Sequence, residues 1–179
     1  MKRLLAAFAM LMLFLTPAVA QDKKDVVYLD TKDGRIEIQL RRDLAPKHVA
    51  QIEALVKRGF YDGIVFHRVI DGFMAQTGDP TGTGTGRSDL PNIPAEFSKA
   101  SFKRGTVGMA RSSDPDSANS QFFICFDEAP FLDGQYTVVG QVTKGMNIVD
   151  KIKKGSKQNN GSVTNPDKIV KMQMATDAK

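Results

Sequence analysis

The chain has 179 residues, with 25 Lys and Arg against 20 Asp and Glu, and a formal net charge of +5. The basic residues form no stripe interleaved with aromatic residues, so the charge does not favour a nucleic-acid partner. The only cysteine, Cys125, excludes an intramolecular disulfide, and its apolar surroundings in FFICF are typical of a buried small side chain.

The first twenty residues are predicted to be a cleaved secretory signal peptide. A basic start precedes an apolar stretch from Leu4 to Leu15, and Ala18 and Ala20 supply small side chains before cleavage after Ala20. The stretch is shorter than the roughly 20 residues that span a bilayer. We expect an exported protein, periplasmic in a Gram-negative host and otherwise secreted, whose residues 21–179 form one domain that is not inserted in the membrane. An uncleaved anchor is the alternative.

The mature part opens with two predicted strands and a helix. Residues 26–31 and 35–40 flank Asp33-Gly34, a hairpin signal, and residues 35–40 alternate apolar and polar side chains. Pro46 at a first helical position, apolar residues at helical spacing up to Val56, and Gly59 just past the end predict a helix of about three turns. We expect His48 on the surface of this helix.

Short apolar runs separated by turn residues fill the rest of the chain. They predict strands within residues 64–69, 72–77, 105–111, 121–126, 136–142 and 168–175, and a second helix over about Met146 to Lys154. This pattern indicates a mainly β fold, namely a closed or nearly closed antiparallel barrel plugged by two helices. Strand spacing alone would also fit a sandwich.

The segment FHRVIDGFMAQTGDP, from Phe66 to Pro80, together with GTVGMAR, SQFFICF and FLDGQYTVVGQV, closely resembles the cyclophilin family. The resemblance covers nearly the whole mature chain. It implies a closed eight-stranded antiparallel barrel capped by two α-helices, with a substrate groove on its outer face. It also implies a peptidyl-prolyl cis/trans isomerase that assists the folding of exported proteins, similar to bacterial periplasmic or secreted members.

The resemblance also implies the site residues. Arg68, in the FHR step, and Gln76 correspond to the catalytic positions. The implied substrate-binding residues are Phe73, Met74, Gly84, Ala110, Arg111, Ser112, Gln121, Phe123, Phe131, Leu132 and Tyr136. No cofactor or metal is expected. The expected partners are proline-containing unfolded or partly folded polypeptides, and the protein is expected to be a monomer that binds no nucleic acid.

The chemistry of proline rotation supports a role for Arg68 independently of the resemblance. The prolyl nitrogen shares its lone pair with the carbonyl, which gives the bond a rotational barrier of about 18–20 kcal/mol. A guanidinium that donates to this nitrogen as it becomes pyramidal stabilises the twisted state more than the ground state. No nucleophile is needed.

Three positions depart from the common cyclophilin pattern. Phe131 stands where many members have Trp, Tyr136 where many have His, and Arg111 with Ser112 where Asn-Ala is usual. Phe lacks the indole N–H donor, so we expect weak cyclosporin binding with catalysis retained. The added charge of Arg111 leads us to expect a preference for acidic residues near the proline.

Other functions fit the residues less well. A non-catalytic proline-binding chaperone module would not need Arg68, and a hydrolase using Cys125 lacks an evident base. The GTGTG run does not match a nucleotide-binding loop. The segment SSDPDSANS, residues 112–120, contains acidic residues but lacks the pattern of a calcium loop. The two histidines and Cys125 show no metal-ligand spacing.

Overall fold

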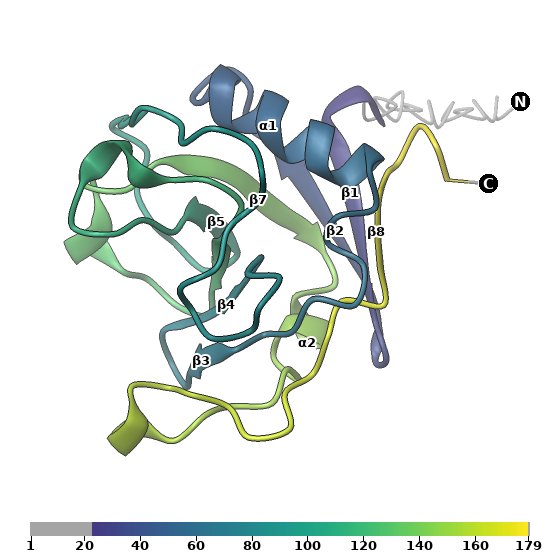
Figure 1. The fold of residues 1–179 in the computed structure, drawn as a ribbon, viewed down its shortest axis with the longest axis vertical. Coiled ribbons are helices and arrows are strands. Elements are labelled where there is room, and N and C mark those ends of the chain that lie inside the picture. The colour runs from purple at the N-terminus through teal and green to yellow at the C-terminus, as the bar shows by residue number, and fades with distance from the viewer. Residues whose placement is uncertain (1–22, 179) are drawn as a thin grey trace, which may run out of the picture.

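The computed structural model describes residues 23–178, and the predicted signal peptide lies outside them (Figure 1). Eight strands form one antiparallel sheet in the order β3-β4-β6-β5-β7-β2-β1-β8. Its elements are β1 (Val26–Thr31), β2 (Gly34–Leu40), α1 (Pro46–Lys57), β3 (Arg68–Ile70), β4 (Met74–Thr77), β5 (Thr106–Met109), β6 (Phe122–Cys125), β7 (Val138–Lys144), α2 (Met146–Val149) and β8 (Lys171–Met174), with single 3₁₀ turns at Lys23–Asp25, Pro115–Ser117, Pro130–Leu132 and Lys157–Asn159.

The first three elements confirm their predictions. In the β1–β2 hairpin, Val27 pairs with Ile38 and Leu29 with Ile36, and all four side chains are buried. Helix α1 begins at Pro46, and its apolar stripe packs into the main core. Period-2 and period-3.6 patterns of apolar residues thus produce a buried sheet face and the helix that covers one end of it (Figure 1).

The mainly β arrangement with two helices is confirmed, because the strands form a single curled sheet rather than a sandwich of two. Helices α1 and α2 lie at opposite ends of this sheet (Figure 1). Closure of the barrel is not confirmed, since no ladder joins β3 to β8 in the described chain. Isolated bridges link Val65 to Lys168 and Arg68 to Ser162 in that region.

Two predictions about the helices are wrong. Helix α2 ends at Val149 rather than near Lys154: the main-chain N–H groups of Lys151 and Ile152 make only i→i−3 bonds (3.1 Å each), and that of Lys153 donates to the side chain of Asp167 (2.9 Å). His48 is fully buried rather than on the surface. The carboxylate of Glu96, from a distant loop, lies 2.7 Å from its Nδ1 and also accepts its main-chain N–H (3.1 Å).

The sheet separates two clusters of buried apolar residues. The larger one lies inside the curled sheet, under α1, and contains the inward residues of β1, β2 and β7. The smaller one belongs to the other face of β4, β5 and β6, and its buried members are Met74, Phe102, Phe123, Cys125, Ala129, Leu132 and Val138. Side chains that alternate along β4 and β6 therefore enter two different clusters.

No helix within residues 23–178 is long and apolar enough to span a bilayer.

Candidate active site

One transverse row of the sheet carries the central side chains of the site. Arg68 on β3 pairs with Gln76 on β4, Gln76 pairs with Phe123 on β6, and Phe123 pairs with Gly108 on β5. Residues opposite one another in a ladder project to the same face, so Arg68, Gln76 and Phe123 are placed side by side by strand register alone. They lie on the face that carries the smaller apolar cluster.

Two adjoining hollows, each of about 410 Å³, lie over this row and share Gln76, Ala110 and Arg111. The first is the apolar hollow, which Arg68 borders and which is also lined by Phe73, Met74, Phe123, Phe131, Leu132, Gln135 and Tyr136. The second is the polar hollow, which is also lined by Gly84, Thr85, Gly86, Arg87, Asn92, Ser112, Ser117, Asn119 and Gln121. All thirteen residues expected from the sequence line one hollow or the other.

Aromatic rings form the wall and floor of the apolar hollow. Phe123 stacks on Phe102 with a centroid separation of 5.8 Å and meets the edge of Tyr136 at 6.0 Å. Phe131, which is 63% exposed, forms the rim and lies 5.3 Å from Phe73. The stacking requires glycine at position 108, where an added Cβ would lie 2.5 Å from the Phe123 ring and 2.6 Å from that of Phe102.

The guanidinium of Arg68 is held at three of its five N–H groups. Nη1 donates to Oε1 of Gln76 (3.1 Å), Nε donates to the main-chain carbonyl of Asn160 (3.0 Å), and Nη2 donates to Oδ1 of the same residue (3.0 Å). Partial burial lowers the pKa of Arg68, against an opposing influence of Tyr136. Arginine nevertheless remains protonated in proteins, so the group is a fixed cation beside an apolar wall.

Gln76 continues into the polar hollow. Its Nε2 donates to Oε1 of Gln121 (2.9 Å), and Nε2 of Gln121 donates to the main-chain carbonyls of Gly84 (3.1 Å) and Gly86 (2.8 Å). A continuous series of hydrogen bonds therefore runs from the glycine-rich loop through two amides to Arg68.

Arg111 and Tyr136, two of the departures from the family pattern, contact each other. The guanidinium of Arg111 lies 4.5 Å from the centroid of the Tyr136 ring and donates to the carbonyl of Gln135 from Nε (3.2 Å) and Nη2 (3.0 Å). Such a cation over an aromatic face is attracted by its electron density. Arg111 thus fixes the wall that separates the two hollows.

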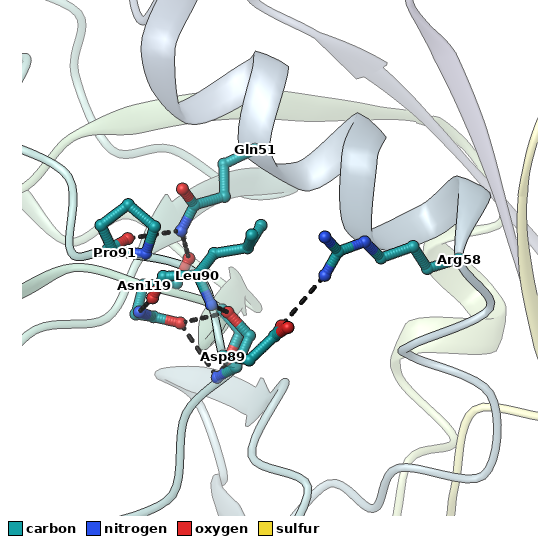
Figure 2. A network of polar contacts seen from close by, with 8 residues as sticks. Gln51, Arg58, Asp89, Leu90, Pro91 and Asn119 are labelled. Carbon is teal, nitrogen blue, oxygen red and sulfur yellow. Dashed lines mark hydrogen bonds and ion pairs between the residues drawn. The ribbon is translucent and has the colours of Figure 1, made fainter.

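The long connection between β4 and β5, which lines the polar hollow, is fastened to α1 (Figure 2). Nε2 of Gln51 donates to the carbonyls of Pro91 (3.1 Å) and Asn119 (3.2 Å), while Nδ2 of Asn119 donates to the carbonyl of Leu90 (2.8 Å). Arg58 and Asp89 also form an ion pair at 3.0 Å, but both side chains are exposed and solvent screens the pair, so it adds little to this attachment. A segment with no strand or helix of its own is thereby held in one conformation.

Other reactive side chains lie outside this constellation. Cys125 is buried in the smaller cluster, and burial raises the pKa of its thiol to about 12, so it is not a nucleophile. Burial also lowers the pKa of His67, a neighbour of Arg68 in the sequence. Within residues 23–178, no three His, Cys, Asp or Glu side chains come together as a metal site.

The sequence did not point to Asn160 or Gln135. Asn160 is 92 residues from Arg68 in the chain, and it has a left-handed backbone with φ of +50°. Asn160-Gly161-Ser162 matches a glycosylation sequon, and nothing else in the sequence singles out Asn160. The isolated bridge between Arg68 and Ser162 and the bond from the main-chain N–H of Val69 to the carbonyl of Gly161 (2.8 Å) bring this turn beside β3.

Known proteins with similar sequences identify the family of this chain. The family model described as cyclophilin type peptidyl-prolyl cis-trans isomerase/CLD matches residues 26–174. A probable peptidyl-prolyl cis-trans isomerase of Brucella suis is 59% identical over 173 residues, covering 90% of this chain and 88% of that protein. A peptidyl-prolyl cis-trans isomerase of Helicobacter pylori is 42% identical over 135 residues, covering 71% and 79%.

Solved structures give the same result. A cyclophilin from Hirschia baltica has a TM-score of 0.78 at 28% identity, covering 88% of this chain and 76% of its own. A cyclophilin-type isomerase from Cryptosporidium parvum, crystallised in the presence of the dipeptide Ala-Pro, has a TM-score of 0.76 at 29% identity, covering 83% and 98%. The chain therefore belongs to the cyclophilin-type peptidyl-prolyl cis-trans isomerases.

Proposed function

We propose that this chain catalyses rotation about Xaa-Pro bonds by a non-covalent mechanism in which Arg68 donates a hydrogen bond to the prolyl nitrogen. The observation that carries the proposal is the position of one cation: Arg68 borders a hollow otherwise lined mainly by apolar side chains, and Gln76 and Asn160 hold three of its N–H groups. Five donors less three leaves two N–H groups for a substrate.

The proline ring occupies the apolar hollow in this mechanism. Phe73, Met74, Phe123 and Leu132 exclude water around it, while Gln76 and main-chain groups hold one side of the bond so that the other side rotates. As the nitrogen becomes pyramidal, its lone pair leaves conjugation and accepts the hydrogen bond from Arg68. The interaction is stronger in the twisted state than in the planar one, which is the condition for catalysis.

The required stabilisation is modest. Uncatalysed prolyl rotation takes tens to hundreds of seconds, and acceleration by about 10⁴-fold requires roughly 5–6 kcal/mol at 1.36 kcal/mol per decade. One donor to developing charge supplies about 2.7–4 kcal/mol in other enzymes, and orientation of the substrate supplies the remainder. Neither a covalent intermediate nor a cofactor enters this mechanism.

The substrates are proline-containing segments of unfolded or partly folded proteins. The Ala-Pro dipeptide named for the Cryptosporidium parvum relative supports a proline-peptide ligand for the corresponding hollow in this chain. The polar hollow beside it accommodates residues that flank the proline. The protein acts as a monomer and, with Phe131 at the rim, binds cyclosporin weakly.

The proposed place of action is outside the cytoplasm, in the periplasm of a Gram-negative host and in the medium otherwise. The basic and apolar start of the chain and its Ala18 and Ala20 support this assignment. The test is to express the full chain in a Gram-negative host, fractionate the cells and determine the N-terminus by mass spectrometry. A periplasmic product that begins at Gln21 supports export, and a full-length cytoplasmic product contradicts it.

The proposed mechanism is tested with residues 21–179 and their Arg68→Ala variant in a protease-coupled prolyl isomerisation assay. We expect the variant to retain about 1% of the wild-type kcat/KM or less, in line with the loss of one transition-state donor. Arg58→Ala, which removes an exposed guanidinium just past the C-terminal end of α1, is the matched control and should keep the wild-type rate. An unchanged rate in Arg68→Ala would refute the role of Arg68.

A binding-only chaperone module is the second candidate, because a proline-binding hollow can hold a chain without accelerating rotation. The same variants separate the two functions when peptide affinity is measured alongside the rate. The isomerase proposal predicts that Arg68→Ala binds a proline peptide within a few-fold of wild type while its turnover collapses. A wild-type protein that binds the peptide but does not accelerate isomerisation would establish the binding-only module instead.

A further inference from the structure

Asp79 is a buried carboxylate that organises the glycine-rich loop. It is only 1% exposed. Oδ1 accepts hydrogen bonds from the main-chain N–H (2.7 Å) and the hydroxyl (2.8 Å) of Thr81, and Oδ2 accepts the main-chain N–H groups of Gly84 (2.6 Å) and Gly86 (3.1 Å). Burial alone would raise the pKa of this carboxyl, but the hydrogen bonds from Thr81, Gly86 and Gly84 outweigh it and lower the pKa to about 2.

The loop wraps so tightly around this carboxylate that only glycine fits at position 86. A Cβ added there would lie 2.0 Å from Oδ1 of Asp79. The wrapping turns the main-chain N–H groups of Gly84 and Gly86 inward to Asp79, while their carbonyls accept from Nε2 of Gln121. The carboxylate therefore determines where two carbonyl acceptors stand at the edge of the polar hollow.

These two carbonyls determine the direction of every hydrogen bond that follows. A carbonyl oxygen can only accept, so Gln121 must turn its NH₂ group to the loop and its oxygen to Gln76. Gln76 must then donate with Nε2 and present Oε1 to Arg68. The reverse orientation would set the NH₂ group of Gln76 against a guanidinium, which has donors only.

We propose that Asp79 is a positioning residue for catalysis, which acts through the loop, Gln121 and Gln76 to hold the guanidinium of Arg68 in its working orientation. The inference rests on the proposed function of Arg68. Asp79 touches neither of the two amides nor the guanidinium. Its influence is transmitted as hydrogen-bond direction, which distinguishes it from a residue that only stabilises a loop.

The first test is Asp79→Asn, which keeps the shape of the side chain but removes its charge and turns an NH₂ group toward main-chain N–H donors. We expect kcat to fall about 10- to 100-fold, since small misplacements at a distance from the chemistry have effects of this size, with KM changed less than about threefold. Asp89→Asn removes an exposed carboxylate from the same connection and is the matched control, expected to keep the wild-type kcat.

A double-variant cycle tests the route of the effect. If Asp79 acts through Gln121, then Asp79→Asn lowers kcat little further in a Gln121→Ala background, by less than about twofold. Losses that multiply in the double variant, or a kcat of Asp79→Asn equal to that of Asp89→Asn, would overturn the proposal. If Asp79→Asn does not fold, Gln121→Glu tests the hydrogen-bond route, because it places a carboxylate next to the carbonyls of Gly84 and Gly86. A wild-type kcat in Gln121→Glu would also overturn the proposal.

A measurement independent of turnover separates this proposal from the function on which it rests. The side-chain NH₂ signals of Gln76 and Gln121 in ¹H–¹⁵N NMR spectra should shift in Asp79→Asn and stay in place in Asp89→Asn. If the Gln76 signals are unchanged in Asp79→Asn, the positioning role of Asp79 is refuted, even if the chain is an active isomerase. If the wild-type chain has no isomerase activity but Asp79→Asn shows the expected shifts, the proposed function is refuted, while the hydrogen-bond connection from Asp79 to Gln76 is supported.

Discussion

Replacing Asn160 with glycine removes one anchor of Arg68 without straining the backbone. The asparagine has φ of +50°, which glycine adopts freely, and its main-chain carbonyl still accepts from Nε of Arg68 in the variant. Only the bond from Nη2 to Oδ1, at 3.0 Å, is lost. A hydrogen bond to a charged group contributes about 1.5–3 kcal/mol, and the exposure of Asn160 places this one near the lower end. If that stabilisation is needed in the transition state, kcat falls about tenfold.

The chain offers a matched control for this variant. Asn165 has the same left-handed backbone, with φ of +51°, and is not a partner of Arg68. Both substitutions add the same backbone freedom to the unfolded chain, so in urea unfolding Asn160→Gly should differ from Asn165→Gly only by the loss of its bond to Arg68. In the protease-coupled assay only Asn160→Gly should lose turnover. Equal rates in the two variants would refute the idea that Asn160 orients the catalytic guanidinium.

Three further outcomes are expected. Gly108→Ala places a Cβ within 2.5 Å of the Phe123 ring, so we expect the free energy of unfolding to fall by about 1–3 kcal/mol and the KM for proline peptides to rise. An unchanged KM, with Phe123 in an unchanged position in a crystal structure of the variant, would contradict this. Stability should fall as pH drops below 6.5, because burial lowers the pKa of both His48 and His67 and the unfolded chain takes up protons that the folded chain resists. The loss is up to about 1.36 kcal/mol per pH unit for each proton. The lowered pKa of Glu96 adds a further loss of stability at more acid pH. In urea unfolding measured at a series of pH values, His48→Gln should make the free energy of unfolding depend less on pH just below 6.5. An unaltered dependence would exclude His48 as a source of the effect. Phe131→Trp should raise the affinity for cyclosporin, measured for both proteins by isothermal titration calorimetry because the wild-type chain contains no tryptophan. No gain would show that the missing indole N–H does not limit binding.

Local patterns predicted the parts of this molecule that depend on nearby residues. Alternation and an Asp-Gly turn were enough for the β1–β2 hairpin, and Pro46 with an apolar stripe was enough for α1. The run that contains Arg68, Phe73, Met74 and Gln76 forms one hairpin, so their proximity follows from the sequence of that segment and its turn. The motifs that carry the family resemblance are local in the same sense.

The parts that were missed depend on contacts between distant segments. His48 was expected on the surface because nothing near it in the chain indicates that Glu96, 48 residues away, would lie on it. After the short helix α2, the main-chain N–H of Lys153 donates to Asp167, 14 residues away, instead of continuing the helix. Asn160 reaches Arg68 only after the C-terminal segment crosses beside β3. Composition and periodicity carry no information about such pairings, which tertiary packing decides.

The transverse row of Arg68, Gln76, Phe123 and Gly108 makes the site sensitive to the number of residues in one turn. Residues 71–73 join β3 to β4, and inserting or deleting a single residue there would shift one strand by one place and send its side chains to the opposite face. The shifted strand would turn Arg68 or Gln76 toward the main apolar core, where Val69 and Ala75 now lie, and the row that forms the site would be lost.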